Sequence, residues 1–112
     1  MSTTLKMNGT GTAALALNGT VPVGQTYRLI SFTLNLSAAP TTSENLTVTL
    51  DAQAGAIYDT LLYSLDLSAG ATADLLWQPD PELLLEGGDV ITVAWANTDV
   101  RNWGAQLTFK AV

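Results

Sequence analysis

The 112-residue chain contains no cysteine and no histidine. Without cysteine no disulfide can form, and without either residue type a structural zinc site lacks its usual ligands. A serine nucleophile would have no histidine to act as its base. A glycine-rich phosphate-binding loop is also missing, and a domain of this size leaves little room for a substrate cleft. These absences predict a protein that is not an enzyme and that binds no metal and no cofactor.

Charge is scarce as well. Charged residues make up 12% of the chain, against about 25% in typical soluble domains. The basic residues Lys6, Arg28, Arg101 and Lys110 are dispersed and the net charge is -6. Nucleic-acid binding requires clustered basic side chains, so we expect no nucleic-acid partner. No apolar run approaches the roughly 18 residues of a membrane span, and the first residues lack the apolar core of a secretory signal, so we expect no membrane partner.

Hydrophobic residues nevertheless make up 47% of the chain. A small domain with few charges and many apolar residues is expected to bury part of its surface against other protein subunits. The alternative is a surface covered by threonine, serine and asparagine, which is polar without being charged.

Short stretches of alternating apolar and polar residues, separated by turn residues, predict an all-β protein. In the longest stretch, Phe32 and Leu34 fall on one face and Thr33 on the other. The predicted strands are Thr12–Asn18, Gln25–Leu36, Glu44–Asp51, Ile57–Leu67, Ala71–Trp77, Leu83–Leu85, Val90–Ala96 and Trp103–Ala111. We therefore expect residues 1–11 to form a flexible N-terminal arm, and residues 12–112 to form a jelly-roll-like antiparallel two-sheet sandwich of about eight strands.

Most aromatic residues share the apolar face of their strand. Trp95, for example, alternates in phase with Ile91 and Val93. This phase predicts that the aromatic residues of the core are Phe32, Tyr63, Trp77, Trp95, Trp103 and Phe109. A sugar-binding platform would require exposed aromatics instead, for which Tyr27 and Tyr58 are the best candidates.

Four apolar residues have the opposite phase and are predicted to point outward: Leu62, Leu76, Leu84 and Val90. Outward apolar side chains are typical of a contact between subunits. The alternative is that these strands are buried on both faces. Arg101 is either an anchor of the same interface or a solvated loop residue paired with Asp99. The acidic residues of the C-terminal turns lack the spacing of a calcium loop and are interpreted as turn residues that accept hydrogen bonds from backbone amides.

One set of residues in the C-terminal third carries a family resemblance. The set comprises Leu76–Asp80, Leu83, Leu85, Gly88–Ile91, Val93, Asn97 and Arg101–Gly104. In this pattern the chain resembles small β-sandwich structural proteins from the virions of tailed bacteriophages. Its closing hairpin is similar to the end of trimeric jelly rolls of the tumour-necrosis-factor type. The resemblance extends from about Gln25 to the C-terminus and transfers no catalytic residue.

The resemblance implies a capsid decoration (cement) protein that stabilises the shell as a homotrimer. Its partners would then be its own sister copies and the major capsid protein. It would lie on the capsid exterior of the virion, and in the host cytoplasm before assembly. The alternative that the resemblance leaves open is a head-fibre or tail-fibre component with a carbohydrate-binding or receptor-binding role.

Overall fold

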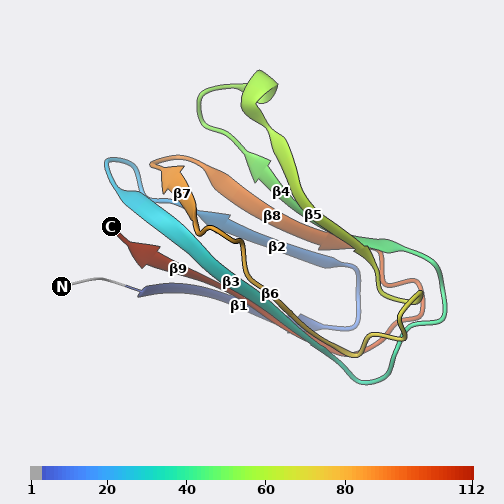
Figure 1. Ribbon diagram of the computed structural model, residues 1–112. Helices are drawn as coiled ribbons and strands as arrows, with labels where there is room; N and C mark the ends of the chain where they lie inside the picture. Colours follow the sequence, from blue (N-terminus) through green and yellow to red (C-terminus); the bar gives the residue numbers. More distant parts are fainter. Residues whose placement is uncertain (1–3) are drawn as a thin grey trace.

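The computed structural model describes residues 4–112, with side chains from Gly9 onward. It contains nine strands and one short 3-10 helix in these residues (Figure 1). The elements are β1 (Thr4–Gly11), β2 (Leu15–Thr20), β3 (Thr26–Leu36), β4 (Asn45–Asp51), η1 (Ala56–Tyr58), β5 (Thr60–Asp66), β6 (Asp74–Trp77), β7 (Leu83–Glu86), β8 (Val90–Trp95) and β9 (Trp103–Ala111). None of the helical structure in residues 4–112 is long and apolar enough to cross a membrane.

The strands form two antiparallel sheets that pack face to face. One sheet has the order β1-β9-β3-β6, with β7 also paired to β3, and the other has the order β2-β8-β4-β5. We name them the β3 sheet and the β4 sheet. Because β6 pairs with the C-terminal half of β3 and β7 with its N-terminal half, the two short strands share a single position in the β3 sheet. The resulting four-plus-four order is that of a jelly roll, so the predicted all-β antiparallel sandwich is confirmed.

Alternation along the strands places the core between the sheets. In β8 the inward residues Ile91, Val93 and Trp95 are almost wholly buried, whereas the residues between them are half-buried. Of the aromatic residues predicted in the core, the structure buries Phe32, Trp95 and Phe109 completely or almost completely. The other three are half-buried and pack against the margin of the core: Tyr63, Trp77 and Trp103.

The segment predicted as a flexible arm is largely a strand, which corrects that prediction. Residues 1–3 lie outside the described residues, but Thr4–Gly11 pairs along its whole length with β9. Its glycines serve packing, because a Cβ atom added to Gly9 would lie 3.1 Å from the Trp103 ring, and one added to Gly11 would lie 3.4 Å from it. The indole of Trp103 therefore lies directly against both glycines, and a side chain at Gly9 would force it to shift.

Candidate interaction surface

The long side of the sandwich where β5 faces β6 and β7 carries two of the four apolar residues that were predicted to point outward. Leu76 pairs with Thr33 and Leu84 with Arg28. These partners lie on the solvent side of β3, so both leucines point outward, with exposed fractions of 62% and 58%. They lie on the same edge of the β3 sheet, because β6 and β7 occupy one position in it.

Leu62 and Val90 do not belong to the same stripe. The pairing of β4 with β5 shifts register after Val48, which pairs with Tyr63, so that Thr49 pairs with Leu61 and leaves Leu62 as the extra residue. Leu62, predicted to point outward, consequently packs against the core, while its neighbour Leu61 is 59% exposed. Val90 is half-buried in the β4 sheet. The predicted stripe is therefore reduced to Leu76 and Leu84.

Between β6 and β7 the edge of the sheet is interrupted and leaves a hollow. Proline has no N–H to donate to a ladder, and β6 ends two residues before Pro79. A hollow of about 290 Å³ lies at this break, and we call it the β6–β7 hollow; its lining is Leu62, Trp77, Gln78, Pro79, Asp80, Pro81 and Leu83. The ring of Trp77, which lines the hollow, is stacked on Tyr63 with centroids 5.3 Å apart.

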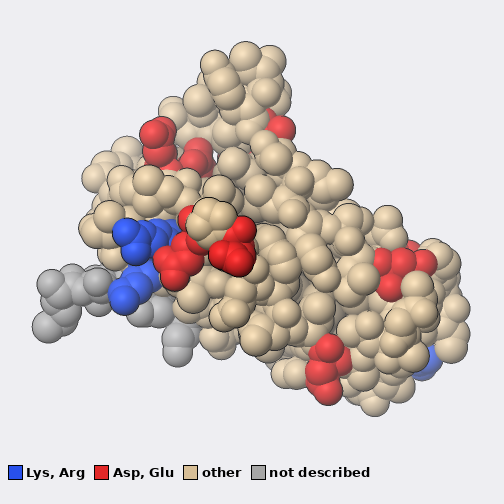
Figure 2. Space-filling model, in the orientation of Figure 1, with Lys and Arg blue, Asp and Glu red and all other residues tan. Residues whose placement is uncertain are grey.

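A second apolar surface was not predicted. Residues 52–59, which we call the finger, connect β4 to β5 and project from the sandwich as a loop with one helical turn (Figure 1). At its tip Ile57 is 86% exposed and Tyr58 is 58% exposed. Apart from red carboxylates near its base, the projection is covered by uncharged residues in Figure 2. The sequence predicted Tyr58 as a candidate exposed aromatic, but it placed both Ile57 and Tyr58 in a strand from Ile57 to Leu67, so the projecting loop was not predicted.

The finger is nevertheless held by hydrogen bonds at its base. The Asp59 carboxylate accepts from the Ala52 backbone N–H at 2.9 Å, and the Asp89 carboxylate accepts from the Gln53 N–H at 2.9 Å. Asp89 also accepts from the Glu86 N–H. Asp89 follows two glycines and has the turn role that the sequence indicated, because its two carboxylate oxygens accept hydrogen bonds from two backbone N–H groups.

The opposite end of the sandwich is a network of loops around Asn97. This buried residue donates from its amide nitrogen to the carbonyls of Thr12, Ala13 and Arg101 at 3.0–3.1 Å, and its side-chain oxygen accepts from the Arg101 N–H at 2.9 Å. One side chain therefore joins the β1–β2 loop to the β8–β9 loop. Nearby, the indole N–H of Trp103 donates to the same Ala13 carbonyl.

Arg101 is half-buried in this network, and its guanidinium donates to the Ala39 carbonyl at 3.1 Å. The Asp99 carboxylate bonds Thr41 and Thr42 rather than Arg101. The Thr42 N–H, the Thr42 hydroxyl and the Thr41 N–H hold the pKa of Asp99 down to about 2, with a smaller contribution from the charge of Arg101. Both side chains thus fasten loops together, and the one ion pair found within the described residues joins Arg28 to Glu82 at 3.8 Å.

Val100, at the tip of this end, combines exposure with an unfavourable backbone. It is 64% exposed and has a φ of +54°, a region that costs an L-residue roughly 1–2 kcal/mol. We expect Val100→Gly to raise the free energy of unfolding by about 0.5–1 kcal/mol, because relief of the strain exceeds the added entropy of the unfolded chain. Urea unfolding followed by tryptophan fluorescence measures this. Val23→Gly, at an exposed position with negative φ, is the control and should lower the free energy of unfolding slightly. Equal effects of the two variants would show that the Val100 backbone is not strained.

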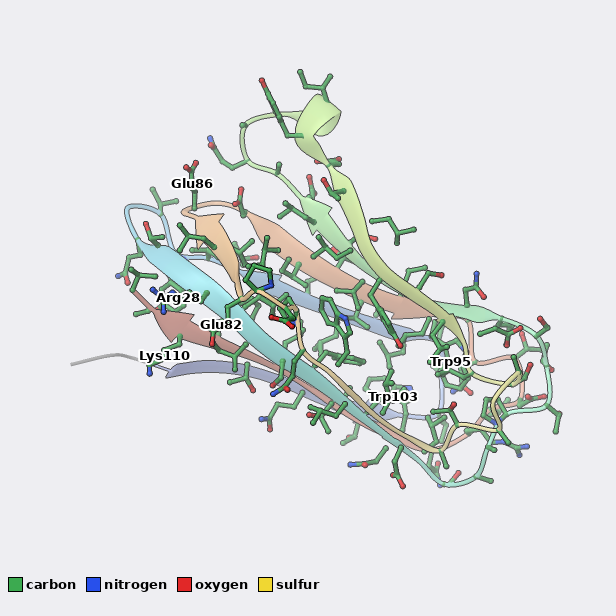
Figure 3. All side chains as sticks on the ribbon, viewed as in Figure 1. Arg28, Glu82, Glu86, Trp95, Trp103 and Lys110 are labelled. Atoms are coloured by element: carbon green, nitrogen blue, oxygen red, sulfur yellow. The ribbon has the colours of Figure 1, made fainter. Side chains whose placement is uncertain are left out.

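Residues that could bind a metal ion or a sugar are few in the part of the chain that the structure describes. Within residues 4–112 no three acidic, histidine or cysteine side chains gather closely enough to hold a metal ion. Of the two tyrosines considered for sugar stacking, Tyr27 is only 4% exposed, which removes it from that role, while Tyr58 stays accessible. Arg28, Glu82 and Lys110 lie near one another on the outer side of the β3 sheet (Figure 3), where the acidic partner offsets the two basic side chains.

Fold and surface together define a jelly-roll β-sandwich with apolar side chains displayed outside a filled core. No protein-family profile matches the sequence, and no curated protein matches it. Among solved structures, a chain from the acidic stable capsid structure of Helicobacter pylori bacteriophage KHP30 aligns over 99% of this chain and 87% of its own length, with 12% identity and a TM-score of 0.55. This chain therefore shares the fold of that capsid chain. A family two carbohydrate esterase from Cellvibrio japonicus aligns with 12% identity over 34% of its length at a TM-score of 0.39, too low to indicate a shared fold.

Proposed function

We propose that this protein is a structural protein of a tailed-phage virion, and that it acts as a trimeric decoration protein stabilising the capsid shell. The observation that carries the proposal is the exposure of Leu76 and Leu84 on a sandwich whose interior is already filled. Apolar side chains that contribute nothing to the core of the protomer are typical of surfaces that bind another subunit.

The energetics agree with such a role. Burying a leucine side chain contributes roughly 1.5–3 kcal/mol, and several such residues are needed to offset the loss of freedom on association. Besides Leu76 and Leu84, the finger and the start of β5 supply Ile57, Tyr58 and Leu61. Similarity of fold to a phage capsid chain over nearly the whole length supports a place in a virion.

The proposed partners are sister copies of the chain and the major capsid protein. The proposed location is the exterior of the capsid, where a protein needs no basic surface for packaged DNA. We expect no nucleic-acid partner, because the net charge is -6 and binding to nucleic acid requires clustered basic side chains that displace counterions.

Self-association of the purified chain is the first test. We expect sedimentation equilibrium to show a trimer, because the exposed leucines gain burial only in an assembly. The double variant Leu76→Ser, Leu84→Ser should dissociate while keeping the stability of the protomer. Val112→Ser, which removes a 70% exposed valine at the C-terminus, is the control. A parent protein that stays monomeric at high micromolar concentration would count against the trimer.

The shell is tested separately. If the adjacent gene encodes a major capsid protein, the two proteins are co-expressed and the assembled shells are pelleted. We expect the chain to co-sediment with the shells and to raise the temperature at which they disassemble, because it adds buried area across capsomer boundaries. Shells that pellet without the chain would exclude decoration.

The second candidate is a fibre component that binds a carbohydrate receptor. It is favoured by one observation, the 58% exposure of Tyr58 at a projecting tip, since an accessible aromatic ring is a platform for sugar stacking. A glycan array probes it directly: binding that is lost in Tyr58→Ser would support the fibre role, and an array without binding would leave decoration as the better account.

A further inference from the structure

We propose that the finger of one copy inserts into the β6–β7 hollow of a second copy, so that Tyr58 becomes the anchor of the contact between subunits. This inference rests on the proposed function for its setting, because it specifies how the sister copies of the proposed trimer would hold one another.

The finger has the properties of a preformed anchor. Its apolar tip gives nothing to its own protomer, since η1 contains no buried residue. Its backbone is ordered, because the Tyr58 N–H donates to the Gly55 carbonyl at 3.0 Å and the Asp59 N–H to the Ala56 carbonyl at 3.1 Å. A tip that is already ordered loses little conformational entropy on binding, and tyrosine is among the residues most often found as the energetic centre of an interface.

The hollow has walls that suit a tyrosine ring. Leu62, Trp77 and Leu83 are half-buried and apolar, and two prolines complete the lining. Trp77 is supported by its stacking on Tyr63, so its exposed part is held in a fixed orientation. Rigid apolar walls of this kind give close packing without a large entropic cost.

The exposed polar residues of the hollow can form a hydrogen bond with the hydroxyl group of a tyrosine. Gln78 and Asp80 are exposed members of its lining, and their side-chain oxygens can accept a hydrogen bond from the Tyr58 hydroxyl. An amphipathic ring with an apolar body and a polar tip is well suited to a pocket that is apolar inside and polar at its rim.

The position of the hollow also links it to the leucines on the same edge. It lies between β6, which carries Leu76, and β7, which carries Leu84. A finger seated in the hollow would therefore cover the break that these two leucines flank. Because the finger and the hollow are different surfaces of one chain, the contact is heterologous, and repetition of a heterologous contact generates a closed ring when the rotation between copies closes.

Cysteine cross-linking tests the contact, because the chain has no cysteine of its own. Tyr58→Cys and Gln78→Cys proteins are prepared separately, mixed under mild oxidation and separated on a non-reducing gel. We expect the mixture to form a disulfide-linked dimer of one copy of each, since a disulfide requires Cα atoms within about 7 Å. Each variant carries one cysteine, so a bond within one chain is impossible, and each protein oxidised alone measures the dimers of two like copies that must be subtracted. A mixture of Val23→Cys with Gln78→Cys is the matched control, with its cysteine at an exposed site elsewhere.

Sedimentation gives the second readout. The variant Ile57→Ser, Tyr58→Ser should weaken self-association by about thirtyfold or more, as loss of a central anchor does, whereas Tyr58→Phe should keep most of it. Filling the hollow with Gln78→Trp should have the same effect as removing the finger. The finger contact would be overturned if cross-linking did not exceed the control and the variants still formed the trimer as the parent does. That result would leave the proposed function intact. A parent that is monomeric throughout would overturn both the contact and the trimer.

Discussion

Replacing Asn97 with aspartate is expected to lower the free energy of unfolding by about 3–5 kcal/mol at neutral pH, because it buries a charge whose one retained hydrogen bond comes from the Arg101 N–H. The substitution exchanges the amide nitrogen, which donates to three carbonyls, for an oxygen that repels them. Asn97 is only 3% exposed, so water cannot solvate the new carboxylate. Urea unfolding at pH 7 measures the loss, and Asn102→Asp, at an exposed neighbouring position, should change stability by less than about 0.5 kcal/mol.

The same variant carries a pH signature. Burial among carbonyl oxygens raises the pKa of the carboxyl group introduced by Asn97→Asp above its unfolded value of about 3.9. The protonated form is therefore favoured in the folded state, and the penalty is largest at neutral pH, where the unfolded chain is ionised. We expect the difference between parent and variant to shrink as the pH falls from 7 towards about 4. A difference that is constant over this range would show that the carboxylate is solvated and that the network is looser than the structure indicates.

Replacing Phe32 with alanine is expected to cost about 3–5 kcal/mol, since the ring is fully buried between the sheets and its removal leaves a cavity. This is a large share of the roughly 5–15 kcal/mol by which a domain of this kind is stable. Leu76→Ala is the matched comparison, because Leu76 lies on the adjacent pair of the same ladder but on the outer face. It should change the stability of the protomer by less than about 0.5 kcal/mol.

The two variants together separate folding from assembly. Thermal unfolding at low concentration should reveal the Phe32→Ala defect alone, whereas sedimentation at high concentration should reveal weakened association in Leu76→Ala. If Leu76→Ala destabilised the protomer as strongly as Phe32→Ala, Leu76 would belong to the core. The proposed interaction surface would then lose its main support.

Alternation of residue types was sufficient to locate most of the strands. The predicted strand Trp103–Ala111 matches β9, and Val90–Ala96 differs from β8 by one residue. In both, each inward residue is apolar and each turn is marked by glycine, asparagine or a polar run, so the local pattern is unambiguous. The outward direction of Leu76 and Leu84 followed from the same period of two.

Strand β1 could not be recognised in this way. Its sequence reads as polar and glycine-rich, although Gly9 and Gly11 pack against the Trp103 indole, which leaves little room for a side chain at Gly9. The partner strand β9 lies at the other end of the chain, as the pairing of Thr4 with Lys110 shows. A glycine that makes room for a distant ring has the same local appearance as a glycine in a flexible arm.

The predicted facing of residues in strand β5 was wrong for a different reason. A single extra residue in a β-bulge reverses the face of every residue beyond it, and the register shift between Val48 and Thr49 does this to Leu61 and Leu62. The finger was missed for a separate reason, because the predicted strand Ile57–Leu67 begins too early and includes η1. The candidate site was therefore predicted in part: the outward leucines of the sheet edge and the exposure of Tyr58 were predicted, and the projecting loop that carries Tyr58 was not.

The sequence by itself determined the all-β class, the two-sheet sandwich and the scarcity of charge, because a period of two and the composition are local properties of the chain. Only the tertiary structure decided that β1 completes the β3 sheet, that a bulge turns Leu61 outward, and that Asn97 joins two loops across a separation of 85 residues. Each of these depends on a contact between residues far apart in the chain, and such contacts leave no periodic trace in the order of the amino acids.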